Sequence, residues 1–293
     1  MKKQFSFFAF LLIFFLMSTI VFADDEILDM DIYNFETQTW QTDQIKANDS
    51  ITSVSESSSN SGISPFIIFG EDGRKIVSNT AQKPYSYIGN VCIYSQKAIC
   101  GYGTGFLVAP SLVLTAAHNV YSQYLDIDAI KFIPGHTEDS YPYGKHDATK
   151  FYIPSQYKEN PNNPKYDFAL IQLKTNVGDT AGYFSLDPNM KIVNNPDKHD
   201  INENKIAVSL TGYPQNDKKH MYKSTGNVYF DGGDYLGYYR MDTDKGQSGS
   251  PIYYKKDGKY YVVGIHIGKT STSDWNRCRL MTNAVYTLIN KYR

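Results

Sequence analysis

From Phe66 to the C-terminus, short apolar runs alternate with turn-forming residues. Such runs are typical of β-strands, and several in succession with few helical patterns indicate a barrel or a sandwich. An Asp-Gly pair at 257–258 separates two tyrosine-rich runs and predicts a tight hairpin. The clearest apolar runs are residues 105–108, 112–114, 168–173, 206–210 and 260–265.

The last residues of the chain follow a different periodicity. Within 282–292, apolar residues stand at 284, 285, 288 and 289, which is the spacing of one face of a helix. We therefore expect an all-β protein that ends in a C-terminal helix.

The N-terminus has the pattern of a secretory signal peptide. Lys2 and Lys3 precede an apolar stretch over residues 5–17, and a small-residue cleavage motif ends at Ala23. This order of charged, apolar and small residues is that of an exported, cleaved leader. A retained membrane anchor is the alternative, although the stretch is short for crossing ~30 Å of hydrocarbon. We expect residues 1–23 to be removed, leaving a secreted, extracellular protein with no membrane attachment.

Residues 24–66 differ in composition from the rest of the chain. The segment begins with acidic residues and continues into a Ser/Asn-rich tract over 50–64. Such a sequence has little apolar surface to bury, which favours a flexible segment. We interpret it as a propeptide that is removed on maturation, which is compatible with its also being a disordered linker, and residues 67–293 as the folded domain.

Composition and charge exclude some classes of function. Hydrophobic residues make up 41% of the 293 residues, enough for one or two compact units. The formal net charge of −1 gives no support for a nucleic-acid partner. An exported chain with the three cysteines Cys92, Cys100 and Cys278 has at least one unpaired thiol. A Cys92–Cys100 bridge is the favoured pairing, and the spacing gives little support for a metal site.

Three segments carry residues that could perform chemistry together. Ser248 lies in the segment GQSGSP, where flanking glycines permit a tight turn with backbone N–H groups aimed at an oxyanion. His118 ends the segment TAAH, and its imidazole suits a general base. Asp167 opens the apolar segment DFALI, where a carboxylate needs a partner such as an imidazole. Taken singly, each has an ordinary reading as a solvent loop, a surface histidine or a strand-start turn residue.

In the order His, Asp, Ser, these segments resemble those of the chymotrypsin-like serine proteases, from about residue 67 to residue 293. Subtilisins and α/β-hydrolases have other chain orders. The resemblance implies two antiparallel β-barrels of the chymotrypsin/trypsin-like fold. It also implies a catalytic triad of His118, Asp167 and Ser248, and an oxyanion hole formed by the N–H groups of Gly246 and Ser248. The expected substrates are proteins or peptides, with no cofactor, and a monomer is expected.

Within that superfamily the chain most resembles the bacterial glutamyl endopeptidases. The resemblance rests on the stretch 68–80 around Arg74, the turn TGYP at 211–214, Thr243 five residues before Ser248, and the segment GIHIG containing His266. It implies that Thr243 and His266 bind an acidic P1 side chain in the S1 pocket. It further implies that a separate protease removes the propeptide and exposes a mature N-terminus near Ile67, beside S1.

Two alternatives remain open at this point. Asp242 lies six residues before Ser248, where trypsin-like enzymes carry the acid that selects Arg or Lys. The protein could instead be an inactive, protease-like secreted binding protein, although such proteins usually lose a triad residue.

Overall fold

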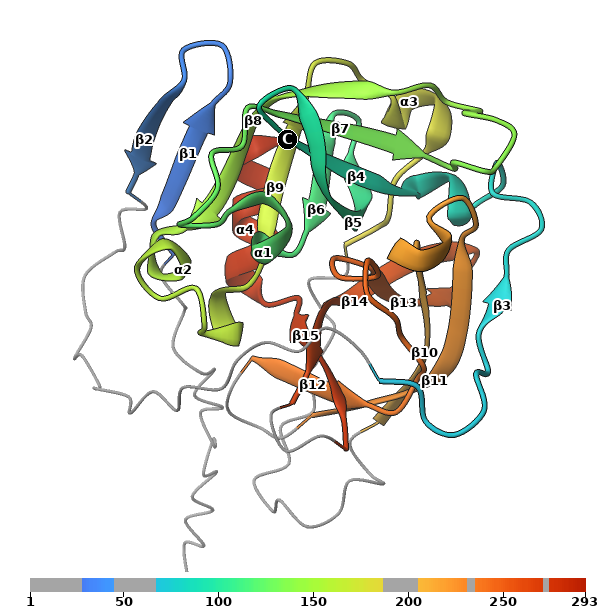
Figure 1. Cartoon of the computed structure of the whole chain (residues 1–293). Helices are drawn as coiled ribbons and strands as arrows, with labels where there is room; N and C mark the ends of the chain where they lie inside the picture. Colours follow the sequence, from blue (N-terminus) through green and yellow to red (C-terminus); the bar gives the residue numbers. More distant parts are fainter. Residues whose placement is uncertain (1–27, 45–66, 187–204, 231–234, 271–273) are drawn as a thin grey trace, which may run out of the picture.

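The computed structural model describes residues 28–44, 67–186, 205–230, 235–270 and 274–293. Two six-stranded antiparallel barrels pack side by side, and a helix at the C-terminus lies against the first of them (Figure 1). The predicted all-β fold with two barrels and a C-terminal helix is confirmed.

The first barrel is formed by consecutive strands in the sheet order β8-β7-β4-β5-β6-β9, and the β8–β9 pairing closes it. The predicted apolar runs 105–108, 112–114 and 168–173 fall on β5, β6 and β9 of this barrel. Its strands are β4 (Ile88–Ser95), β5 (Ala98–Ala109), β6 (Leu112–Thr115), β7 (Ala129–Pro134), β8 (His146–Pro154) and β9 (Ala169–Leu173).

The second barrel follows the order β10-β13-β14-β15-β12-β11 and is closed by the β10–β11 pairing. Asp257 and Gly258, both with positive φ (50° and 76°), form the predicted two-residue hairpin turn between β13 and β14. The short strand β3 (Lys75–Ile76) pairs with the edge of β11. The barrel strands are β10 (Lys205–Gly212), β11 (Tyr222–Phe230), β12 (Leu236–Tyr239), β13 (Pro251–Lys256), β14 (Lys259–Lys269) and β15 (Asn276–Leu280).

The longest helix of the described residues is the predicted one, α4 (Asn283–Tyr292). Thr282 caps it by accepting a hydrogen bond from the Val285 N–H. Within the part of the chain that the structure describes, no helix has the length and apolarity needed to span a bilayer. Short helical turns occupy the loops: η1 (Tyr85–Tyr87), α1 (Ala117–Val120), α2 (Ser155–Glu159), η2 (Pro164–Tyr166), α3 (Gly178–Ala181) and η3 (Gln215–Asp217).

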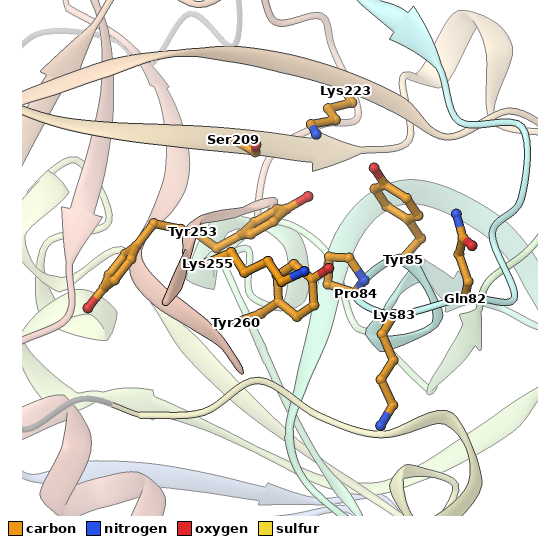
Figure 2. Close-up of a pocket in the computed structure, with 10 residues that line it drawn as sticks. Gln82, Lys83, Pro84, Tyr85, Ser209, Lys223, Tyr253, Lys255 and Tyr260 are labelled. Carbon is orange, nitrogen blue, oxygen red and sulfur yellow. The ribbon is translucent and has the colours of Figure 1, made fainter. Parts of the chain in front are cut away.

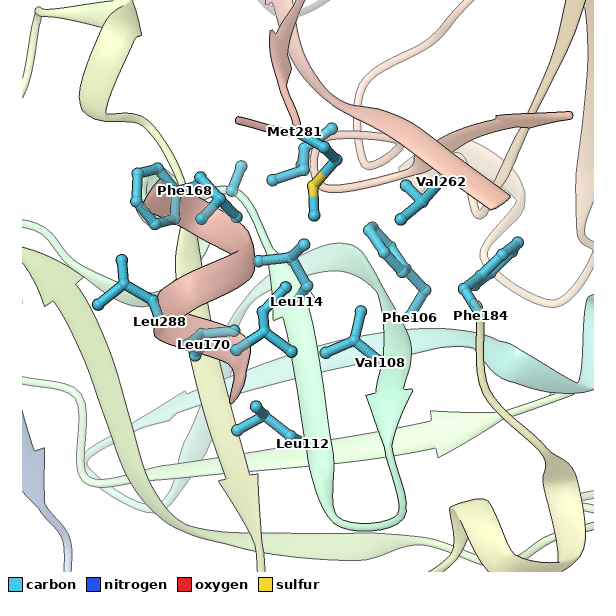
Figure 3. Close-up of a cluster of buried hydrophobic side chains, with 14 of the residues drawn as sticks. Phe106, Val108, Leu112, Leu114, Phe168, Leu170, Phe184, Val262, Met281 and Leu288 are labelled. Atoms are coloured by element: carbon cyan, nitrogen blue, oxygen red, sulfur yellow. The ribbon is translucent and has the colours of Figure 1, made fainter. Parts of the chain in front are cut away.

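The largest apolar cluster lies between the barrels rather than inside either one (Figure 3). Phe106 and Leu114 enter it from the first barrel, Val262 and Met281 from the second, and Leu288 from α4. All five side chains are essentially enclosed. Burying one such side chain contributes about 1.5–3 kcal/mol, so this cluster fixes the relative placement of the two barrels.

Residues 28–44 differ from the flexible segment predicted for this part of the chain. They form a hairpin of β1 (Met30–Asn34) and β2 (Thr39–Asp43), and β1 adds to the first sheet beside β8. The composition of the neighbouring Ser/Asn-rich tract obscured the alternation of polar and apolar residues here. The predicted signal peptide and the tract at 50–64 lie outside the described residues, and the propeptide assignment stays a prediction.

The favoured Cys92–Cys100 disulfide does not form in the structure, where all three cysteines are free thiols. Cys92 lies directly across from Tyr102, so Cys100 is two residues out of register with it. Burial raises the pKa of the Cys92 thiol to about 11 and that of Cys278 to about 12. Both thiols are therefore protonated and poorly reactive at neutral pH.

We expect one fast-reacting thiol in the native protein, Cys100, which is exposed. A maleimide added at pH 7 should label one site in the folded chain and three after unfolding, counted by mass spectrometry. The Cys100→Ser variant should show no fast labelling. If the native wild-type chain takes up no label and its mass is lower by two hydrogens, the Cys92–Cys100 disulfide forms after all.

Candidate active site

The structure brings together His118 and Asp167, two of the three predicted triad residues. The short helix α1 follows β6 directly and presents the His118 ring at the end of the barrel strand. Asp167 is fully buried and holds this histidine twice: Oδ2 lies 2.7 Å from Nδ1, and Oδ1 accepts the His118 backbone N–H at 3.0 Å. A carboxylate on Nδ1 places the proton there and leaves Nε2 as the base.

Two arginines of β15 support the Asp167 segment, and the sequence pattern did not identify them. Arg279 is completely buried; its Nε donates to the Lys165 carbonyl at 2.5 Å, and its guanidinium lies 5.3 Å from the Phe168 ring centre. Arg277 is two residues away on the same face of the strand and only 6% exposed. Burial lowers its pKa, and the negative charge of Asp167 opposes that shift. Arg277 therefore helps to accommodate the buried carboxylate, whereas Arg279 holds the residues on either side of it.

Ser248 is held beside His118 through its backbone. Its carbonyl accepts hydrogen bonds from Asn119 Nδ2 and from the Thr104 N–H, both at 2.8 Å. Because Asn119 directly follows His118, this bond connects the serine loop of the second barrel to the histidine helix of the first. The described residues contain no hydrogen bond between Ser248 Oγ and His118, a contact that often tightens only when substrate binds.

The loop before Ser248 has the backbone expected of an oxyanion hole. Gly246 adopts φ +94°, and a Cβ there would stand 2.4 Å from the Gln215 nitrogen, so only glycine fits. The N–H groups of Gln247 and Gly249 donate to backbone carbonyls. Those of Gly246 and Ser248, the two predicted donors, make no hydrogen bond within the described part of the chain. They are therefore available to a substrate oxygen.

Thr243 and His266, the predicted S1 residues, are both fully buried. Among the described residues Thr243 Oγ1 has no hydrogen-bond partner, whereas its backbone N–H donates to the Ile67 carbonyl at 3.0 Å. His266 Nδ1 is hydrogen-bonded to the Tyr239 hydroxyl. Tyr239 thus fixes the orientation of the His266 ring, and the start of the predicted mature domain at Ile67 lies against the predicted pocket.

Asp242 has a role that the sequence did not reveal. Its two carboxylate oxygens accept the backbone N–H groups of Phe69 and Gly73, each at 2.7 Å. A Cβ on Gly73 would approach the carboxylate to 3.2 Å. Asp242 therefore anchors the stretch that follows Ile67.

Arg74 attaches the same stretch to the serine loop. Its Nη1 donates to Gln247 Oε1 at 3.0 Å, and its Nη2 pairs with Asp72 at 2.8 Å. The side chain of Arg74 is only 5% exposed. The residue before Ser248 is thus fixed by the N-terminal part of the domain.

The structure also contains a hollow of about 390 Å³ that is separate from these residues (Figure 2). Tyr85, Tyr253 and Tyr260 line it together with Lys223 and Lys255. None of the predicted catalytic or S1 residues contributes to its wall. This hollow is therefore separate from the predicted active site.

Of the supporting residues that the sequence analysis missed, only Asn119 had a local signal, because it is adjacent to His118. The other supporting residues, Thr104, Tyr239 and Arg279, act through partners that are far away in the chain. Thr104 is 144 residues from Ser248 (248 − 104), and Tyr239 is 27 residues from His266. No spacing rule within one strand predicts such contacts.

A family model for trypsin matches residues 76–293, and the chain therefore belongs to the trypsin family. Its fold and family define it as a serine endopeptidase of that family.

Two curated relatives are similar over most of the chain. One is a glutamyl endopeptidase of Bacillus licheniformis, 29% identical over 240 residues, which cover 77% of this chain and 69% of the relative. The other, named as an extracellular metalloprotease of Bacillus subtilis, is 31% identical over 237 residues, with 78% and 70% covered.

Solved structures show the same fold. A Glu endopeptidase in complex with MPD superposes with a TM-score of 0.63 at 29% identity, covering 77% of this chain and 98% of that one. The protease Anisep from Arthrobacter nicotinovorans gives 0.58 at 17% identity, covering 74% and 98%, and supports the fold alone. The predicted resemblance to the glutamyl endopeptidases is confirmed.

Replacing Ser248 by Ala should lower kcat by about 10⁶-fold, to background, because the nucleophile is lost. Asp167→Asn should lower kcat by about 10⁴-fold, because an amide cannot hold His118 in the required tautomer. Both are measured on a chromogenic peptide, with circular dichroism to verify folding. Ser140→Ala, in an exposed turn, is the matched control and should be unchanged. Full activity in Ser248→Ala would exclude the assignment.

Proposed function

We propose that the protein is a secreted glutamyl endopeptidase that cleaves peptide bonds after Glu, and less well after Asp, using His118, Asp167 and Ser248. The observation that carries the specificity is the contrast between two adjacent residues. The Asp242 carboxylate is taken up by backbone N–H groups, whereas the buried Thr243 hydroxyl has no partner among the described residues.

The proposed chemistry assigns one role to each of the three residues. His118 Nε2 removes the hydroxyl proton as Ser248 Oγ attacks the scissile carbonyl carbon. The negative charge that develops on the carbonyl oxygen is stabilised by the Gly246 and Ser248 N–H groups. His118 then donates its proton to the leaving amine, and a water molecule hydrolyses the acyl-enzyme by the same route. The Asp167 carboxylate stabilises the imidazolium formed in each step.

An acidic P1 side chain needs donors in S1 to replace the water that it loses. The Thr243 hydroxyl and the His266 ring supply donors of the right kind, and Tyr239 orients the ring. A carboxylate bound at His266 would also favour the protonated ring and a charge-assisted hydrogen bond. The printed name of the Bacillus licheniformis relative, a glutamyl endopeptidase, supports the same specificity.

Cleavage after Arg or Lys through Asp242 is the rival specificity. A substrate cation would have to compete with the Phe69 and Gly73 N–H groups for that carboxylate. Losing those bonds would release the N-terminal stretch of the domain from the S1 wall. The geometry at Asp242 therefore favours a structural role.

Secretion is part of the proposal. It is supported by the leader pattern of the N-terminus and by the printed name of the Bacillus subtilis relative, which is called extracellular.

A P1 scan tests the specificity. Matched peptides with Glu, Asp, Arg, Lys or Phe at P1 should give the highest kcat/KM for Glu. Thr243→Val should lower kcat/KM for Glu about 10- to 100-fold, because one hydrogen bond to a charged group is lost, and should leave the Phe peptide nearly unchanged. A preference for Arg or Lys that Asp242→Asn abolishes would replace the glutamyl assignment. No cleavage of any peptide would favour the binding-protein alternative.

Maturation at Ile67 should activate the enzyme. The backbone N–H of Thr243 donates to the Ile67 carbonyl. Cleavage before Ile67 would therefore create a positively charged amine next to the proposed S1 residues. We expect a precursor beginning at Asp24 to be at least 10-fold less active on the Glu peptide than the cleaved form. N-terminal sequencing identifies the cut, and kcat/KM is measured before and after it. Equal activity in both forms contradicts this step.

A further inference from the structure

The hairpin at residues 28–44 completes an edge that the first barrel leaves open. On one side of β8, β7 pairs only with residues 146 and 147, while β9 covers the other side from Ala148 to Tyr152. The strand β1 pairs with residues 150–154 on the side that β7 leaves. An uncovered edge of this kind exposes backbone N–H and C=O groups to other chains. The hairpin supplies the missing hydrogen-bond partner.

The contact also buries apolar surface. Leu28 is 1% exposed and Met30 is completely enclosed. The Trp40 ring centre lies 5.4 Å from that of Phe151 on β8 and 5.9 Å from that of Tyr121. Such ring pairs add to the stabilisation from area burial alone. Leu28 and Met30 belong to the same apolar cluster that joins the two barrels, so the hairpin is packed into the core of the domain.

Polar contacts from both strands fix the open end of the hairpin, where Met30 pairs with Asp43 and Asp31 with Thr42. Asp31, which is 7% exposed, accepts a hydrogen bond from Thr42 at 2.6 Å and lies 3.4 Å from the Lys158 ammonium of α2. At the same end, on β2, Asp43 accepts a hydrogen bond from the Tyr292 hydroxyl and pairs with Lys291 of α4, both at 2.8 Å.

We infer that residues 28–44 stay bound to the protease domain after maturation, so that the mature enzyme is a non-covalent two-chain protein. The inference rests on the proposed cut, in which one water hydrolyses the Phe66–Ile67 bond. No described hairpin contact involves Ile67, Thr243 or the residues between 67 and 74. Cutting there removes the covalent connection and leaves every contact of β1 and β2 in place.

The bound hairpin would also support the catalytic histidine. The Tyr121 ring packs edge-to-face against Trp40. The Tyr121 backbone N–H donates to the Ala117 carbonyl at 3.0 Å, at the end of the helix α1 that carries His118. Loss of the hairpin would expose this side of α1. The hairpin is thus a second chain whose binding surface adjoins the active site.

The test uses the full secreted chain with Ser248→Ala, to prevent self-digestion, and a site-specific protease sequence placed before Ile67. After cleavage at about 1 µM, gel filtration and native mass spectrometry should find the N-terminal fragment and the domain in one 1:1 complex. Met30→Asp, which forces a charge into the enclosed site, should weaken retention about 100-fold. Trp40→Ala is a milder second variant, and Thr37→Ala in the exposed turn is the control that keeps the fragment.

Elution of the wild-type fragment separately from a folded domain would overturn the inference. The engineered cut makes this result independent of the natural maturation site. If the natural enzyme is not cleaved before Ile67, the proposed maturation site is wrong. The engineered cut still shows whether the fragment stays bound. Release of the fragment by Thr37→Ala as readily as by Met30→Asp would also count against a specific hairpin contact.

Discussion

The buried carboxylate of Asp167 is the constraint on which the site depends. It has no exposed surface, and an unpaired charge in such a place would cost several kcal/mol. The carboxylate is hydrogen-bonded to the ring and to the backbone N–H of His118, and it interacts electrostatically with Arg277 of β15. Because these partners come from both barrels, satisfying one charge fixes the histidine, the end of β6 and the barrel interface together.

The serine loop is positioned by the same interface. Thr104 and Asn119 belong to the first barrel, yet both donate to the Ser248 carbonyl of the second. The apolar cluster between the barrels holds these donors at a fixed distance without taking part in the chemistry (Figure 3). A rigid apolar interface with a few polar connections is what preorganisation of a nucleophile and its base requires.

The N-terminal stretch of the domain connects the proposed maturation site to the proposed S1 residues. Asp242 and Arg74 hold residues 67–74 against the serine loop. The backbone N–H of Thr243 donates to the carbonyl of Ile67, the first residue of that stretch. The hairpin at residues 28–44 instead binds β8 and α4, next to the histidine helix. One part of the N-terminal region therefore contacts the loop of Ser248, and another part packs beside the helix of His118.

The sequence by itself determined the strand-rich domain, the Asp-Gly turn at 257–258, the C-terminal helix and the residues in His-Asp-Ser order, because these signals depend on near neighbours in the chain. Only the tertiary structure decided that Asp242 serves as an anchor, that Tyr239 orients His266, that Cys92 and Cys100 are out of register, and that residues 28–44 form part of a sheet. Each of these depends on which distant strand becomes the neighbour, and barrel closure selects that neighbour through contacts no local pattern records.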